Sequence, residues 1–262
     1  MNKRLKILLT NDDGYDSIGL RHMYETLSKR HEVFIAAPEV EQSGIGHAFT
    51  FNKPLQFAPI PDCAALPGFA IRGTPSDCVK FALSYLLPVK PDVVISGMND
   101  GENSGISGFY SGTVAAAREG AFWRLPSFAF SLSKGEKPFF SEYAQAAMDI
   151  VDTFIELPVS SRHAPRNGMQ VYYNVNFPSC SPDKCKGRKV TRQSCAFFDD
   201  RYRRIRIGEG EEGFIIFGEK MDVEESELFD SRALMNDYTT ITPLCFDSTA
   251  HWVFQDLSAL EQ

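Results

Sequence analysis

The 262-residue sequence contains no long apolar run, and this absence bears first on where the protein works. No stretch approaches the roughly eighteen apolar residues that a transmembrane helix needs. Residues 1–6 are basic, but the apolar run that follows them covers only residues 7–9, which is too short for the core of a signal peptide. We therefore expect a cytoplasmic protein with no membrane partner.

The six cysteines lack the spacing of a metal site. None forms a Cys-x-x-Cys pair, and no histidine lies near them at zinc-finger spacing. Thiols scattered in this way are typical of proteins from a reducing compartment. We expect free, mostly structural cysteines and no zinc site.

The sequence also lacks an excess of positive charge. Its formal net charge is −7 and its pI is about 5.3. Proteins that bind the phosphate backbone of long nucleic acids usually carry a basic domain or stripe, so we expect no such partner. With 43% hydrophobic and 23% charged residues, the composition is that of an ordinary soluble globular protein. An acidic protein that acts on an anion needs a cation or local hydrogen-bond donors at its site.

The first 160 residues alternate between short apolar runs and segments with helical spacing of apolar residues. Strands are expected at 5–10, 33–37, 91–96 and 127–132, and helices at 19–27, 75–86, 113–121 and 139–156. This βαβα order predicts an α/β fold, a three-layer, Rossmann-like, mainly parallel sheet with right-handed crossovers.

The pattern changes after about residue 180. Apolar or alternating residues at 202–207 and 214–217 flank a Gly-Glu-Gly-Glu-Glu-Gly turn, which predicts a β-hairpin. Two-stranded ribbons are seldom stable alone, so we expect this one to pack on a partner subunit. We divide the chain into a catalytic core, residues 1–178, and an extension, residues 179–262, that comprises the hairpin and tail and returns a strand, residues 238–243, to the core.

Two adjacent carboxylates, Asp12 and Asp13, follow the first predicted strand. At about 4 Å and an effective dielectric constant of about 20, two such charges repel by roughly 4 kcal/mol. A hard divalent cation removes this penalty because it prefers oxygen ligands. An Asx-type turn at the end of the strand explains the same residues without a metal. This segment alone leaves both interpretations open.

Two further polar, glycine-bearing segments, 37–47 and 96–105, follow the second predicted strand and the 91–96 strand. Ligands of open α/β sheets bind beyond the carboxyl ends of the strands, where all three segments meet. Ser43 and Asn99 could there complete the oxygen shell of a cation. His47 is a candidate acid or substrate contact, or it stabilises its loop; the sequence leaves these alternatives open.

A helix N-terminus is expected beside these loops. Ser111 can cap the helix that begins near Thr113, and the first N–H groups of that helix would offer an anion site. A cation beside a helix N-terminus is one way for an acidic protein to hold a phosphate group.

Motifs along nearly the whole chain combine in one pattern. They are Thr10-Asn11-Asp12-Asp13-Gly14, Ala37-Pro38, Ser43-Gly44-Ile45-Gly46-His47, the 73–79 segment Gly-Thr-Pro-Ser-Asp-Cys-Val, residues 91–99 with Gly101 and Asn103, residues 110–120, Asn174-Val175-Asn176-Phe177-Pro178, Asp230, and Ile241-Thr242-Pro243-Leu244 with Asp247, Thr249 and Ala250. In this combination the sequence resembles the SurE survival proteins, which are metal-dependent phosphatases acting on nucleoside monophosphates.

The resemblance implies the composition of the site. It implies that Asp12, Asp13, Ser43 and Asn99 hold one divalent cation per subunit, Mg²⁺ or Mn²⁺. It also implies a homodimer or homotetramer whose C-terminal hairpin and tail exchange between subunits. Met98 stands where isoleucine is usual in the family. Residues 180–227 match poorly, which leaves the oligomer geometry and the substrate preference open.

Together these features predict a phosphomonoesterase that hydrolyses nucleoside 5′-monophosphates, with 3′-monophosphates and short polyphosphate as further candidate substrates. The expected catalytic residues are Asp12, Asp13 and Asn99, around a cation that polarises the phosphoryl oxygens. The expected substrate-binding residues are Gly44, Asn103, Ser111, Gly112 and Thr113.

Two alternative functions compete with this prediction. A haloacid-dehalogenase-type phosphatase would place its two acidic residues two positions apart, whereas Asp12 and Asp13 are adjacent. A non-catalytic nucleotide or metal sensor would use the same ligands without turnover. The preferred base, the physiological cation and the chemical role of each aspartate are not determined by the sequence.

Overall fold

The computed structural model describes residues 4–157, 171–208 and 211–254. Residues 209–210 of the predicted hairpin turn lie outside these ranges. Within the described residues, no helix combines the length and the apolar character needed to cross a bilayer.

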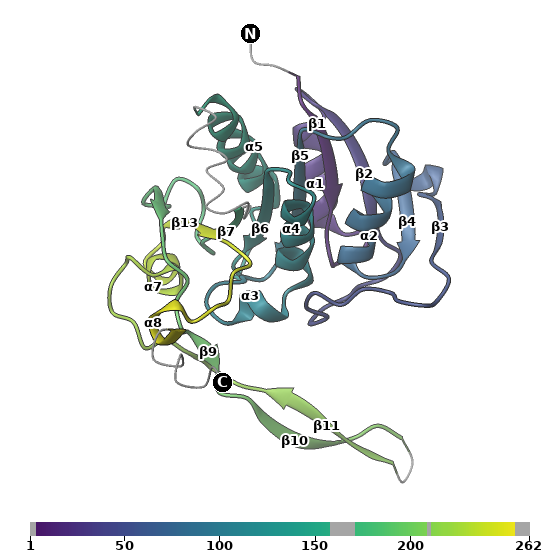
Figure 1. The fold of residues 1–262 in the computed structure, drawn as a ribbon. Helices are drawn as coiled ribbons and strands as arrows, with labels where there is room; N and C mark the ends of the chain where they lie inside the picture. Colours follow the sequence, from purple (N-terminus) through teal and green to yellow (C-terminus); the bar gives the residue numbers. More distant parts are fainter. Residues whose placement is uncertain (1–3, 158–170, 209–210, 255–262) are drawn as a thin grey trace, which may run out of the picture.

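A nine-stranded, mainly parallel sheet forms the centre of the molecule (Figure 1). Its strands, in spatial order, are β3 (Gln56–Pro59), β4 (Gly68–Arg72), β2 (Glu32–Pro38), β1 (Lys6–Thr10), β5 (Val93–Asp100), β6 (Ser127–Leu132), β7 (Tyr172–Phe177), β13 (Thr239–Leu244) and β8 (Arg188–Val190). Only β3 with β4 and β13 with β7 pair antiparallel within this sheet. The predicted α/β Rossmann-like fold is confirmed.

Helices cover both faces of the sheet. The main ones are α1 (Ile18–Leu27), α2 (Pro75–Phe81), α4 (Gly112–Phe122) and α5 (Phe140–Glu156), and the shorter ones are α3 (Ser107–Tyr110), α7 (Asp230–Met235), α8 (His251–Phe254) and the one-turn segments Asp62–Ala64 and Ala82–Leu86. The expected helix 75–86 ends as an α-helix at Phe81 and continues as one turn of π-helix. Thr74 and Asp77 cap its start reciprocally, with Pro75 in the first turn.

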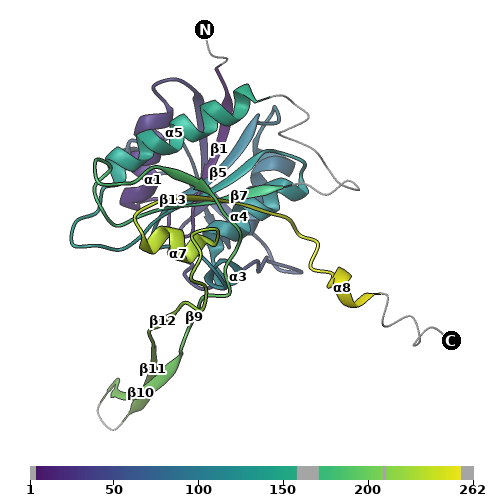
Figure 2. The same cartoon turned by 90° about the vertical axis from the view of Figure 1, so that its left-hand side faces the viewer.

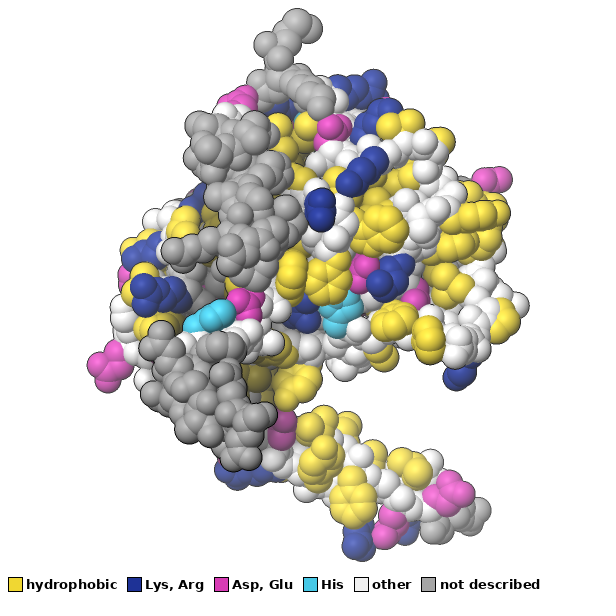
Figure 3. All heavy atoms as spheres, in the orientation of Figure 1, with side chains coloured by type: hydrophobic (Ala, Val, Ile, Leu, Met, Phe, Trp, Pro, Cys, Tyr) yellow, Lys and Arg dark blue, Asp and Glu magenta, His cyan; other side chains and the backbone are white. Residues whose placement is uncertain are grey.

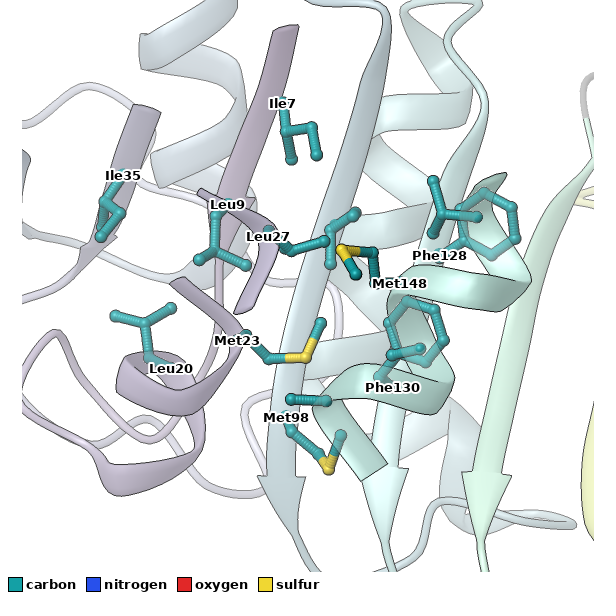
Figure 4. Close-up of a cluster of buried hydrophobic side chains, with 14 of the residues drawn as sticks. Ile7, Leu9, Leu20, Met23, Leu27, Ile35, Met98, Phe128, Phe130 and Met148 are labelled. Carbon is teal, nitrogen blue, oxygen red and sulfur yellow. The ribbon is translucent and has the colours of Figure 1, made fainter. Parts of the chain in front are cut away.

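The alternation of residues along β1 explains the three layers. Ile7 and Leu9 pack with α1 and α5 on one face, in the cluster that Figure 4 shows with Met23 and Phe128. Leu8 points to the other face and packs with residues of α2 and α4. Strands buried on both faces in this way read as continuous apolar runs, which is why the sequence reveals them.

The C-terminal extension has three parts. β8 and β13 complete the central sheet. β10 (Arg201–Arg206) and β11 (Glu212–Phe217) form an antiparallel ribbon that projects from the body (Figures 1 and 2), with β9 (Phe197–Phe198) and β12 (Lys220–Met221) paired at its base. Helix α8 also lies away from the sheet (Figure 2).

The projecting ribbon carries apolar side chains in contact with solvent. Tyr202, Phe214 and Ile216 are more than half exposed, and hydrophobic groups are visible along the ribbon in Figure 3. A contiguous apolar surface of this kind is typical of a protein–protein interface.

Candidate active site

The three polar loops meet at one edge of the sheet, as parallel strands require. A cavity of about 450 Å³ lies there. The predicted site residues that line it are Asp12, Asp13, Ser43, Gly44, Asn99 and Asn103. Ser111, Gly112 and Thr113, which the structure also describes, are not among its lining residues.

Asn11 builds the turn that carries the two aspartates. Its Nδ2 donates to the carbonyl oxygen of Gly14 at 2.8 Å and to Oγ of Ser17 at 2.8 Å. Ser17 in turn accepts from the N–H of Leu20 and caps α1. Gly14 takes a φ of 98°, which glycine tolerates without strain. An Asx-type turn and a metal site are therefore compatible at this strand end. The side chain of Asn11 forms the turn, and the carboxylates of Asp12 and Asp13 take no part in it.

The N-terminus of α4 holds the carboxylate of Asp12. The hydroxyl of Thr113 donates to Oδ1 of Asp12, and the backbone N–H groups of Gly112 and Thr113 also hydrogen-bond to this carboxylate. Burial raises the pKa of Asp12, and these hydrogen bonds offset only part of that effect. The N–H groups of Gly112 and Thr113 and the hydroxyl of Thr113, which were expected to bind a phosphate, thus hold the carboxylate of Asp12 in this structure. Contact of Ser111, Gly112 and Thr113 with a substrate stays a prediction.

Gly112 makes this close approach possible. A Cβ at position 112 would lie 2.8 Å from Cβ and 3.0 Å from Oδ2 of Asp12, and 3.0 Å from Cγ of Pro75. Side chains at such separations must move apart. The glycine is therefore required by the packing of α4 against Asp12.

The cavity concentrates negative charge. Four of its lining residues are carboxylates, Asp12, Asp13, Glu41 and Asp100. Burial, followed by the charge of Asp12 and smaller effects of Asp100 and Glu41, raises the pKa of Asp13 to about 6. Charges held this close in a partly buried site favour binding of a cation.

The donor atoms suit a hard divalent cation. Nδ2 of Asn99 donates to the carbonyl oxygen of Gly101 at 2.7 Å, which leaves Oδ1 of Asn99 available as a ligand. The hydroxyl of Ser43 donates to Oε1 of Glu41 at 2.5 Å and keeps its own lone pairs. Among the described residues, no three His, Cys, Asp or Glu side chains gather closely enough to hold a metal by themselves. Neutral oxygens would therefore have to complete the shell of a cation bound here, and all-oxygen shells suit Mg²⁺ and Mn²⁺.

Lys134, which the sequence analysis did not single out, also lines the cavity. It follows β6 at the same edge of the sheet and is the one Lys or Arg among the lining residues of this cavity. Extending the strand-end argument to the fourth predicted strand would have found it. The positively charged side chain of Lys134 can therefore contact an anionic substrate.

His47 lies outside this cavity. Its Nε2 is 3.0 Å from Oε2 of Glu119, and its ring stacks on Phe122 with the centroids 5.3 Å apart. Glu119 is buried and also accepts from Lys80 and from the indole of Trp123. Of the two alternatives for His47, this geometry favours stabilisation of the loop that carries Ser43.

The buried Glu119 predicts a pH-dependent contribution to stability. Burial alone raises its pKa, but hydrogen bonds from His47 and Lys80 outweigh burial and hold the pKa below the ordinary glutamate value. The stabilisation is therefore present above that ordinary value and is lost as the pH falls through the lowered pKa. We expect Glu119→Gln to lower the free energy of unfolding by about 2 kcal/mol at pH 7, and by progressively less as the pH falls through the lowered pKa.

Urea denaturation of both proteins from pH 7 to pH 3 measures this difference. Glu25→Gln is the matched control, because Glu25 pairs with His22 on the surface at 3.7 Å. Exposed pairs contribute about 0–1 kcal/mol, so the control should change little. An effect of Glu119→Gln that is the same at every pH would contradict the assigned ionisation.

Comparison with known proteins identifies the family to which the chain belongs. The family model described as "Survival protein SurE" matches residues 7–200. The chain belongs to the SurE family. Similar proteins include the 5′-nucleotidase SurE of Syntrophobacter fumaroxidans, 36% identical over 253 residues that cover 97% of this chain and 98% of the relative. The 5′-nucleotidase SurE of Thermosipho africanus is 35% identical over 240 residues, 92% of this chain and 91% of the relative.

A solved SurE structure shares the fold. The SurE protein from Aquifex aeolicus superimposes with a TM-score of 0.81 at 34% sequence identity, covering 98% of this chain and 100% of that chain. The family membership and the α/β architecture expected from the sequence are thus both confirmed.

Proposed function

We propose that this chain is a cation-dependent phosphomonoesterase that hydrolyses nucleoside 5′-monophosphates. The observation that carries the proposal is the acidic cavity that brings Asp12, Asp13, Ser43 and Asn99 together at the ends of β1, β2 and β5. The SurE relatives are named 5′-nucleotidases, which supports the substrate class. Nucleoside 3′-monophosphates and short polyphosphate are further candidate substrates.

Asp12, Asp13, Ser43 and Asn99 would hold the cation, Mg²⁺ or Mn²⁺. When bound, such a cation neutralises charge on the phosphoryl oxygens and lowers the pKa of a coordinated water. Thr113 fixes the orientation of Asp12 through its hydroxyl, so that this carboxylate keeps one geometry. A carboxylate that is already held in the reactive geometry does not have to reorient before the reaction, which lowers the barrier.

Asn103 is held rigidly for contact with a phosphate oxygen. Its backbone N–H donates to Oδ1 of Asn176 at 2.7 Å, and its carbonyl oxygen accepts from Nδ2 of Asn174 at 2.8 Å. One hydrogen of its own Nδ2 is used by Ser131, which leaves the second hydrogen for a ligand. Lys134 would add charge to the same contact, and Gly44 would offer its backbone N–H.

Metal removal tests the proposed function. We expect EDTA-treated protein to release phosphate from AMP at least about a hundredfold more slowly than untreated protein, because the cation supplies several kcal/mol of transition-state stabilisation. Added Mn²⁺ or Mg²⁺ should restore the rate and raise the melting temperature, since a ligand that binds only the folded state stabilises it.

A panel of 5′-AMP, 5′-GMP, 3′-AMP and tripolyphosphate ranks the substrates in the same assay. Folded protein that gains stability from Mn²⁺ and from AMP but releases no phosphate would contradict the enzyme and identify a sensor. Activity that survives EDTA unchanged would contradict the cation site.

We also propose that the ribbon of β10 and β11 packs on other copies of the chain, giving a homodimer or homotetramer. The exposed Tyr202, Phe214 and Ile216 support this proposal, because water-exposed apolar ribbons are seldom stable alone.

A further inference from the structure

A second cavity adjoins the one that holds the acidic residues. Its volume is about 530 Å³, within the roughly 300–1,000 Å³ that small-molecule sites commonly span. Asp100 and Lys134 line both cavities. Because the two cavities share these residues, they lie side by side.

We propose that this second cavity binds the nucleoside part of the nucleotide whose phosphate lies in the first. The inference rests on the proposed phosphomonoesterase function and adds to it the residues that recognise the base. Lys134, at the junction, would lie beside the ester linkage between phosphate and ribose, and Phe198 would pack on the face of the base.

The apolar side of the second cavity suits a base. Phe198 comes from β9, and Leu234 and Met235 come from α7. Phe198 is 47% exposed, so its ring is accessible to a ligand. Stacking of a base on an aromatic side chain is worth about a tenfold change in affinity, and it tolerates any base because every base has a π-face.

The polar side of the cavity suits ribose and not a second phosphate. Three of its residues are carboxylates, Asp100, Glu102 and Asp237, and one is a cation, Lys134; Glu102 is also paired with Lys220, and Asp237 with Lys186 at 3.8 Å. Ionised carboxylates only accept hydrogen bonds, so they match the hydroxyl groups of ribose and the amino groups of bases. With Lys134 as the one Lys or Arg among the described lining residues, this half of the site offers a second phosphate little positive charge, whereas its acceptors suit a neutral nucleoside.

Phe198 is fixed next to the loop that follows β5. In the ribbon base Phe198 pairs with Lys220 of β12. Nζ of Lys220 donates to Oε1 of Glu102 at 2.5 Å and to Oγ of Ser104 at 2.6 Å. The strand that presents the ring is therefore anchored to the loop after β5, the strand that carries the predicted metal ligand Asn99.

The test compares hydrolysis of AMP with hydrolysis of ribose 5-phosphate, which has the same phosphate and sugar but no base. In the wild type we expect kcat/KM for AMP to exceed that for ribose 5-phosphate by about tenfold or more. Phe198→Ala should remove this preference by raising KM for AMP, with a much smaller change in the kinetics of ribose 5-phosphate. An equal kcat/KM for the two substrates in the wild type would overturn the inference.

Phe197→Ala is the matched control. Phe197 neighbours Phe198 on β9 and is similarly exposed, at 41%, but adjacent residues of a strand point to opposite faces, and Phe197 is not among the described residues that line the cavity. It should keep the wild-type preference for AMP. Loss of the preference in both variants would assign the effect to the ribbon as a whole and overturn the role of the Phe198 ring.

Inhibition by adenosine separates the two proposals. Adenosine should compete with ribose 5-phosphate in the wild type and about tenfold more weakly in Phe198→Ala. Hydrolysis of ribose 5-phosphate without any competition by adenosine would leave the phosphatase standing and overturn the nucleoside cavity. Absence of phosphate release from both AMP and ribose 5-phosphate would overturn the proposed function, and this inference with it.

Discussion

Replacement of Asp13 by asparagine is expected to lower kcat/KM for AMP by about a hundred- to a thousandfold while the fold is retained. Asp13 lines the acidic cavity beside Asp12, and its carboxylate is half buried at the end of β1. The amide keeps the shape of the side chain but removes the charge that would bind the cation. A bound cation contributes several kcal/mol to transition-state stabilisation, and each 1.4 kcal/mol or so corresponds to a factor of ten in rate.

Steady-state kinetics at saturating Mn²⁺ measures the loss, and thermal melting with and without Mn²⁺ shows whether the cation still binds. Asp16→Asn is the matched control, since Asp16 belongs to the same turn but is exposed and is not among the described residues that line the cavity. The control should retain full activity. Near-wild-type turnover of Asp13→Asn would remove this residue from the site.

Replacement of Gly112 by alanine is expected to lower kcat by about a hundredfold because the added methyl group displaces Asp12. The added Cβ would meet Asp12 at 2.8 Å and Pro75 at 3.0 Å, so α4 and the Asp12 carboxylate must separate. A shift of about 1 Å in a catalytic group can cost a factor of about a hundred. Alanine favours a helix more than glycine does, by about 1 kcal/mol, so weaker helix propensity cannot explain a loss.

Gly108→Ala is the matched control for this substitution. A Cβ at Gly108 would have its nearest neighbour, the carbonyl oxygen of Asn103, at 3.4 Å, which is an ordinary contact. Circular dichroism and kinetics of both variants check the expectation. Wild-type kcat in Gly112→Ala would show that the contact between α4 and Asp12 has no catalytic consequence.

The part of the fold that the sequence predicts is the part with strong periodicity. β1, with its alternate residues buried on opposite faces, and α5, with its recurring apolar positions, are recognised from local pattern alone. β3 and β8 are missed because both are short and their residues are mostly exposed, so no hydrophobic period marks them. Their position in the sheet is decided by pairing with distant strands, which a local pattern does not contain.

The same distinction applies to the site. The sequence predicts that four residues lie close together, because the carboxyl ends of parallel strands share one edge of the sheet. These residues are Asp12, Asp13, Ser43 and Asn99. The role of Thr113 in holding Asp12 involves a contact across 101 positions of the chain. The pairing of His47 with Glu119 spans 72 positions. Such tertiary contacts decide what a polar residue does, and composition or spacing does not reveal them.

The base of the projecting ribbon, formed by β9 and β12, also contributes Phe198 to the wall of the second cavity. Lys220 ties β12 to Glu102 and Ser104, so the ribbon base and the loop after β5 behave as one mechanical unit. A reorientation of that base displaces Phe198 together with the loop. Coupling between two binding events is reciprocal. If copies of the chain associate through the ribbon and this association raises the affinity for nucleotide, nucleotide binding strengthens the association by the same free energy.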